Sequence, residues 1–76
     1  MTSEIASAVP LNSSSLAIVS FDPSHGTLRV NFVDGSQHSY HEVSEATFLD
    51  LLSADSKGWF FNRNIRGRYP FTQHQN

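Results

Sequence analysis

The amino-acid sequence predicts a small α+β domain, built as a three-stranded antiparallel β-meander with one or two C-terminal helices packed on one face. Three observations lead to this fold class. The segments 16–21 and 27–33 have the composition of strands and are separated by a turn. An Asp-Gly pair at 34–35, which is a strong hairpin signal, follows the second strand. Apolar residues then recur at helical spacing over 46–52.

The first two strands are predicted from β-branched and alternating apolar residues. The segment 16–21 is apolar and β-branched enough for a strand. The segment 22–26 contains Pro, which restrains its own φ, and Gly, which accepts a positive φ, so a turn is expected there. Alternation in the second strand then places three apolar side chains on one face, those of Leu28, Val30 and Phe32. This strand is expected to bury that face and to expose Arg29 on the other.

The length of the hairpin loop decides which residues of the third strand face the core. A two-residue loop would place a serine beside the apolar face of the second strand, whereas a three-residue loop over 33–35 would place His38 and Tyr40 there. Because burying Tyr40 gains more free energy than burying a serine, we predict the three-residue loop. Phe32 then lies opposite Ser36, and the glycine of the loop is left-handed.

Two helices are predicted in the second half of the chain. Ser44 is a natural helix cap, and the apolar stripe that follows predicts a helix over about 44–54. The segment 59–66 reads as a second short helix, which Gly67 ends. The predicted core consists of Val19, Phe21, Leu28, Val30, Phe32, Tyr40, Phe48, Leu51, Leu52, Phe61 and Ile65.

The length and composition predict one domain. The 76 residues divide into a flexible lead-in over 1–10, a folded domain over 11–71 and a flexible tail over 72–76. The longest apolar run is too short for a bilayer and the start does not resemble a signal peptide, so we expect a cytoplasmic protein without membrane contact. The chain has no cysteine, which excludes disulfides and thiolate-metal sites. A monomer or weak dimer is expected.

Charge and aromatic residues are concentrated together near the C-terminus. The segment 56–71 contains four of the five cations and five of the nine aromatic residues. No acid follows Asp55, so residues 56–76 carry a charge of +4. Residues 1–55 hold one cation and all seven acids, for a net charge of −6. A local mixture of cations and rings is a candidate contact surface, whereas the overall charge of −2 argues against strong non-specific nucleic-acid binding.

Motifs along the chain resemble those of the KTSC domain, a module named for its occurrence at the C-terminus of some lysyl-tRNA synthetases. The early positions that match its pattern are Leu11, Ser13, Ser14, Phe21, Asp22, Phe32 and Gly35. The C-terminal positions that match are Ser56, Gly58, Phe60, Phe61, Asn62, Ile65, Arg66 and Tyr69. In the central Tyr-x-Tyr of the pattern, His38 replaces the first tyrosine and Tyr40 is retained. The resemblance spans about residues 11–70. It implies a stand-alone bacterial or phage protein, without an established activity and with RNA binding as a suggested role.

We expect a small non-enzymatic binding or regulatory module that docks on a protein partner, for example one of the transcription or translation machinery. It would dock through its C-terminal basic-aromatic segment, residues 56–71. Arg, Trp and Tyr dominate the energetics of such interfaces. The alternative is weak RNA binding through the same basic-aromatic segment and the exposed sheet face, in which cations grip phosphates and a ring stacks on a base. The candidate partner-binding residues are Trp59, Arg63, Arg66, Arg68, Tyr69, Lys57, Arg29 and Tyr40. No cofactor, metal or small-molecule substrate is expected.

Three structural or chemical alternatives accompany this interpretation. Arg66 could instead hold the second helix to the domain through a bidentate ion pair with Asp55, Asp50 or an acidic residue of a strand. His38 and His41 lie three apart on a strand and point to opposite faces, so they do not form a metal site together. A hydrolase with a serine nucleophile and a histidine base is a third possible function, although the sequence lacks a Gly-x-Ser-x-Gly elbow.

Overall fold

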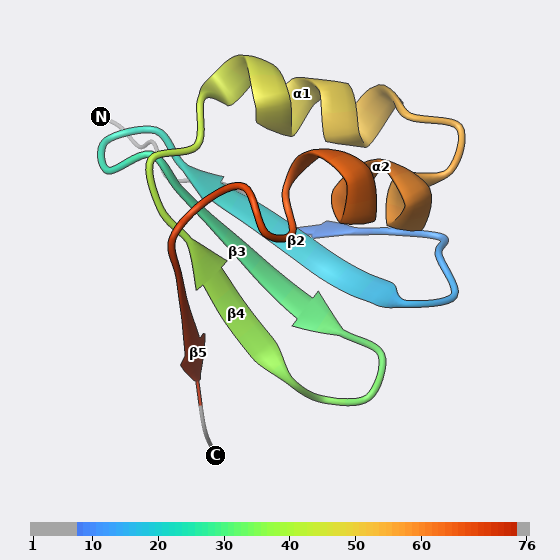
Figure 1. Cartoon of the computed structure of the whole chain (residues 1–76). Coiled ribbons are helices and arrows are strands. Elements are labelled where there is room, and N and C mark those ends of the chain that lie inside the picture. The colour runs from blue at the N-terminus through green and yellow to red at the C-terminus, as the bar shows by residue number, and fades with distance from the viewer. Residues whose placement is uncertain (1–7, 75–76) are drawn as a thin grey trace.

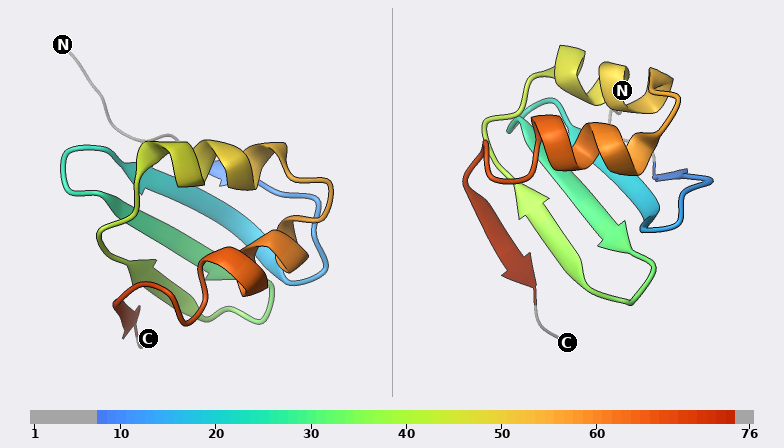
Figure 2. Two further views of the ribbon diagram at one scale, coloured as in Figure 1. Left: turned by 45° about the horizontal axis from the view of Figure 1, so that its top comes forward. Right: turned by 45° about the vertical axis from the view of Figure 1, so that its right-hand side comes forward.

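The computed structural model describes residues 8–74, and within them two helices cover one face of a five-stranded antiparallel sheet (Figure 1). The strands lie in the sheet in chain order. They are β1 (Val9–Pro10), β2 (Leu16–Asp22), β3 (Thr27–Phe32), β4 (Gln37–Tyr40) and β5 (Phe71–His74), and the helices are α1 (Glu45–Ser53) and α2 (Lys57–Asn64). Both views of Figure 2 show the two helices on the same side of the sheet. The α+β class and the one-sided helical layer are therefore as predicted.

The prediction of three strands is wrong, because the sheet has a further strand at each edge. β1 pairs with β2 and comprises only two residues, which is too short for any periodic signal. β5 pairs antiparallel with β4, with Phe71 opposite Tyr40, and its mostly exposed residues are polar after Phe71, so they show no apolar alternation. Part of the predicted lead-in and part of the predicted tail thus belong to the sheet. Residues 1–7 and 75–76 lie outside the described residues.

The register of the β3–β4 hairpin is the one predicted. The backbone amide of Phe32 donates to the carbonyl of Ser36 (2.9 Å), and the amide of Gly35 donates back to the carbonyl of Phe32 (3.0 Å). Gly35 has a φ of 94°, so the loop needs a residue that tolerates the left-handed region. This loop places Tyr40 opposite Leu28 on the face covered by the helices, where the tyrosine is only 2% exposed.

Capping serines define the start of both helices. The Ser44 side chain accepts a hydrogen bond from the amide of Thr47, and α1 ends with Ala54 as its C-cap, close to the predicted bounds. The Ser56 side chain accepts from the amide of Trp59, so α2 begins two residues earlier than predicted. Its C-cap is Ile65, and Gly67 follows with a φ of 78°. No helix within residues 8–74 is long and apolar enough to cross a membrane.

The core lies between the sheet and the helices. Its buried apolar residues are Leu16, Val19, Phe21, Leu28, Val30, Tyr40, Val43, Leu51, Phe61 and Ile65. Leu16 and Val43 were missed by the sequence analysis, and the predicted core residues Phe32, Phe48 and Leu52 are only partly buried. Phe61 meets Tyr40 edge to face at 5.4 Å between ring centroids. Since each large buried side chain contributes roughly 1.5–3 kcal/mol before entropy, Phe61 and Ile65 fix the rotation of α2 about its axis.

Candidate functional site

The burial of one side of α2 turns a defined set of side chains toward solvent. Phe61 and Ile65 are four residues apart and both are buried. Trp59, Asn62 and Arg63 are exposed at positions i, i+3 and i+4 of the helix, where they form a second stripe. Arg66 and Arg68 are exposed in the turn that follows the helix. We call this set the α2 surface: Trp59, Asn62, Arg63, Arg66 and Arg68.

The centre of the α2 surface is a tryptophan ring stacked with a guanidinium. The Trp59 side chain is 61% exposed, and Cζ of Arg63 lies 4.9 Å from the centroid of its ring. A cation–π contact at an exposed site contributes about 0.5–1 kcal/mol. This contact therefore restrains both side chains before any partner binds, while much of the ring stays accessible.

The cations of the basic-aromatic segment have only neutral hydrogen-bond acceptors. Arg66 Nη1 donates to Asn62 Oδ1 (3.2 Å), Arg68 Nε donates to the Arg63 carbonyl (3.1 Å), and Lys57 Nζ donates to the carbonyl of Ala54 (2.7 Å). Across residues 8–74 the only ion pair joins Asp22 to His25, which are remote in sequence from this segment. Within residues 8–74, Arg66 therefore forms no ion pair with Asp55, Asp50 or a strand acid. The positive charge of the surface is not neutralised by carboxylates in the described part of the chain.

Four of the residues predicted to bind a partner lie outside this surface. One of them is Lys57, which is partly buried at the start of α2. Arg29 is exposed, but it lies opposite Ser20 of β2 and Ser39 of β4, with its side chain on the sheet face away from the helices. Tyr40 is buried in the core, and Tyr69 is partly buried against the same core. Arg29 therefore faces away from α2, and Tyr40 has almost no accessible surface for a partner.

Tyr40 is nevertheless linked electrostatically to the surface. Burial raises the pKa of its phenol, and the nearby positive charge of Arg66 opposes that rise. The phenol oxygen lies 3.3 Å from His38 Nδ1, the residue that replaces the first tyrosine of the central motif. Arg66 thus lies near enough to the core tyrosine to affect its ionisation while its own side chain remains exposed.

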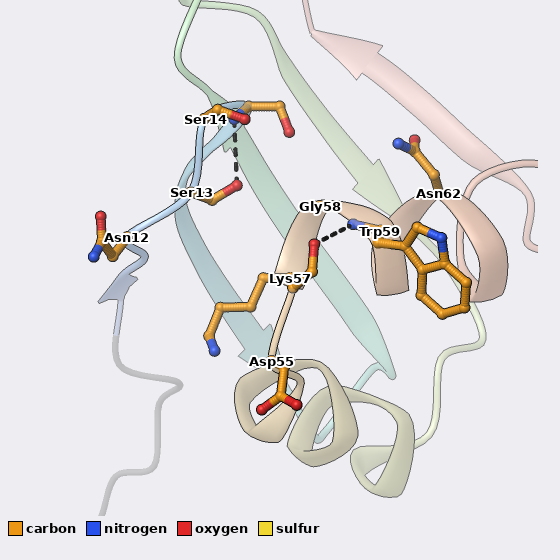
Figure 3. Close-up of a pocket in the computed structure, with 10 residues that line it drawn as sticks. Asn12, Ser13, Ser14, Asp55, Lys57, Gly58, Trp59 and Asn62 are labelled. Atoms are coloured by element: carbon orange, nitrogen blue, oxygen red, sulfur yellow. Dashed lines mark hydrogen bonds between the residues drawn. The ribbon is translucent and has the colours of Figure 1, made fainter.

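A pocket that the sequence analysis missed adjoins the α2 surface. It has a volume of about 450 Å³ and lies between the loop 12–15 and the first turns of α2 (Figure 3). Its lining residues are Asn12, Ser13, Ser14, Ser15, Asp55, Ser56, Lys57, Gly58, Trp59 and Asn62. The two walls are some forty positions apart in the sequence, so no local pattern could join them. The available signal was that the serine pair at 13–14 and the Ser-x-Gly segment at 56–58 both match the same family pattern.

The loop and the helix approach closely at Gly58. A Cβ placed on Gly58 would lie 3.1 Å from Ser15 Oγ and 3.6 Å from Ser13 Oγ. Ser13 Oγ accepts from the amides of Ser15 and Leu16, which gives the loop a turn of its own. The hydroxyls of Ser14 and Ser15 have no hydrogen-bond partner in the described part of the chain, and Figure 3 shows Ser14 at the rim of the pocket, across from Asn62. These two hydroxyls are available to a ligand.

A serine–histidine pair does occur, but it lies on the other face of the sheet. Ser39 Oγ and His74 Nε2 are 2.7 Å apart, and Thr72 Oγ1 and His41 Nε2 are 2.9 Å apart. Ser39 is only 3% exposed, so its oxygen is poorly placed to attack a substrate. Both pairs join β4 to β5, which fits a structural role. No cluster of three metal-ligating side chains occurs in residues 8–74.

Comparisons with known proteins confirm the family resemblance. The family model of the KTSC domain matches residues 12–69. The chain is 35% identical over 60 residues to a protein of Tsukamurella paurometabola, with 79% of this chain and 90% of that protein covered. It is 37% identical over 54 residues to a lysine–tRNA ligase of Nostoc punctiforme, covering 71% of this chain but only 10% of the ligase. The crystal structure of a KTSC domain protein from Yersinia pestis superposes with a TM-score of 0.86 at 28% identity, covering 93% of this chain and all of that one.

Proposed function

This chain belongs to the KTSC domain family, and from that premise we propose that it is a non-enzymatic binding module that docks on a protein partner through the α2 surface. The proposal includes a cytoplasmic location, with which the cysteine-free sequence is compatible. It also includes a partner in the transcription or translation machinery. The similarity of this domain to a segment of a lysine–tRNA ligase motivates that choice.

The exposed Trp59 ring under the Arg63 guanidinium is the observation that carries this proposal. Tryptophan and arginine are the residue types most enriched among those that dominate binding energy. A small domain that leaves its single tryptophan 61% exposed forgoes the burial of its largest apolar side chain. Restraint of the pair by its cation–π contact lowers the entropy cost of ordering these side chains in a complex.

The surroundings of the pair also favour docking by a protein. The pocket lined in part by Trp59 provides a concave feature with the hydroxyls of Ser14 and Ser15, and the exposed arginines of the α2 surface provide hydrogen-bond donors. This combination of a central aromatic anchor and a polar rim is typical of specific protein interfaces. The domain has a second exposed surface, the face of the sheet that carries Arg29, but that face lies on the side away from the helices (Figure 1).

RNA binding remains the second candidate, because the same surface is basic and a matching segment occurs in a lysine–tRNA ligase. The structure changes what this candidate requires. An RNA that used both α2 and the sheet face would have to wrap around the edge of the domain, since these surfaces face opposite ways. With about four phosphate contacts on the α2 side alone, such binding would be weak and sensitive to salt.

An affinity capture experiment tests the proposal. The immobilised protein is incubated with bacterial lysate, with and without nuclease, at low and high salt. We expect a defined protein to be retained after nuclease treatment and to be lost from the Trp59→Ala variant. Arg29→Gln serves as the matched control, because it removes a cation from the opposite face and should leave retention unchanged. Loss of every partner on nuclease treatment, with a steep salt dependence, would instead favour RNA.

A further inference from the structure

This inference rests on the proposed function and names the chemistry of the partner. We propose that the α2 surface binds a short acidic segment of a protein. The carboxylates of that segment pair with Arg63, Arg66 and Arg68, and its main chain lies across the mouth of the adjoining pocket. The inference specifies the occupant, whereas the proposed function concerns only the surface that is used.

Uncompensated charge on the α2 surface is the first argument. Four cations lie within residues 57–68 and no acid follows Asp55. Lys57 and Arg68 donate to backbone carbonyls, and Arg66 donates to the side-chain amide of Asn62. The guanidinium of Arg63 lies over the Trp59 ring. A guanidinium has five donors, so each arginine keeps most of its donors free for a planar carboxylate. The complementary ligand is therefore anionic.

The limited extent of the basic area is the second argument, and it favours a short acidic segment over a nucleic acid. α1 lies beside α2 on the same side of the sheet (Figure 2) and carries exposed Glu45 and Asp50. Asp55 lines the very pocket that adjoins Trp59. A polyanion that continued past the arginines in this direction would meet these carboxylates and be repelled. A segment with a few acidic residues in register with the arginines would not.

Neutral polar groups in the pocket are the third argument. The hydroxyls of Ser14 and Ser15 and the amide of Asn62 border the cavity, and each can donate or accept. Such groups suit the alternating amides and carbonyls of a peptide main chain. Lys57 is half-buried, and its ammonium group donates a hydrogen bond to the carbonyl of Ala54. It therefore contributes positive potential at the pocket, and we do not assign it a direct contact with the ligand.

Calorimetric titration of the full chain with three probes tests this inference. The probes are a Gly/Ser peptide with interspersed Asp and Glu, the same peptide with Asn and Gln in their place, and oligouridylate. Fluorescence of Trp59, the only tryptophan, reports whether a probe reaches this surface. We expect the acidic peptide to bind, to change the Trp59 emission and to weaken as salt rises. The amide peptide should bind at least about tenfold more weakly.

Matched variants locate the binding. The double variant Arg63→Gln with Arg66→Gln should weaken the acidic peptide by about tenfold, because it removes two exposed charge pairs. Arg29→Gln, on the far face, should change affinity by less than about twofold, since solvent screens charges at that separation. An equal effect of Arg29→Gln would mean diffuse charge attraction and would overturn the inference.

Two further outcomes separate this inference from the proposed function. Tighter binding of oligouridylate than of the acidic peptide would overturn the acidic segment as occupant. Binding of neither probe would also overturn it. In both cases, retention of a nuclease-resistant protein partner by the native chain, lost on Trp59→Ala, would leave the docking function standing with a different occupant. If that retention also fails, both the acidic segment as occupant and the docking function are refuted.

Discussion

Replacing Gly58 with alanine probes the contact between the serine loop and α2. Gly58 lies in the first turn of α2, in helical backbone, where alanine is favoured over glycine by about 0.5–1 kcal/mol. The added Cβ would lie 3.1 Å from Ser15 Oγ, which is a few tenths of an ångström too close. The sign of the net effect therefore depends on whether Ser15 can move.

Ser15 has the freedom to move, at a cost. Its side chain is exposed, and its hydroxyl has no hydrogen-bond partner in the part of the chain that the structure describes. A displaced rotamer costs about 0.5–1.5 kcal/mol. This cost is similar to the gain in helix propensity, so we expect Gly58→Ala alone to change the free energy of unfolding by less than about 0.5 kcal/mol. In the Ser15→Ala background the obstructing oxygen is gone, and the same change should stabilise the protein by about 0.5–1 kcal/mol.

Urea denaturation of the four proteins in this cycle gives the coupling energy directly. We expect the two substitutions to couple by roughly 0.5–1 kcal/mol, with unchanged m-values. Purely additive effects would refute the reasoning, because they would mean that the loop does not lie against α2 at Gly58. Destabilisation of more than about 2 kcal/mol in both backgrounds would also refute it, since backbone crowding would then outweigh the Ser15 contact.

Three other predictions concern the core, the stacked pair and the buried tyrosine. Phe61→Ala should lower the free energy of unfolding by about 3–5 kcal/mol, because it opens a cavity under α2, whereas Leu49→Ala on the exposed side of α1 should cost at most about 0.5 kcal/mol; chemical denaturation compares the two. Arg63→Gln should change the emission of Trp59 but alter stability by no more than about 1 kcal/mol, and an unchanged spectrum would contradict the stacking. Tyr40 should contribute an alkaline dependence of stability. Its folded pKa is raised above the ordinary value of 10.0, so its contribution is complete below that pH and is lost as pH rises through the folded pKa. Tyr40→Phe should remove this part of the pH profile, and the same alkaline loss in the variant would assign it to another group.

Local chemistry was sufficient to predict much of the fold. The Asp-Gly loop and the gain from burying Tyr40 determined the hairpin register, which the hydrogen bond from the Phe32 amide to the Ser36 carbonyl confirms. Ser44 and the apolar stripe after it determined α1. The four-residue spacing of Phe61 and Ile65 determined which side of α2 is buried. Each of these features depends on neighbours a few residues apart, so the chain carries the information in short patterns.

Edge strands and the pocket could not be predicted in this way. β5 contains one apolar residue, Phe71, followed by three polar ones, and its place is determined by pairing with β4 and by the stacking of Phe71 on Tyr40, more than thirty residues away. The pocket exists because the loop 12–15 meets the start of α2. Nothing in either segment alone indicates the other, and burial at such contacts is decided only when the sheet and helices are assembled.

The amino-acid sequence by itself determined the α+β class, the hairpin, the Ser44 cap of α1 and the concentration of cations beside Trp59. Only the tertiary structure decided which of those cations share a surface. It separated Arg29 from the arginines of α2 by the thickness of the sheet and the helical layer, and it buried Tyr40 beneath them. The physical reason is that periodicity specifies a face of each element, whereas the relation between faces depends on how the elements pack.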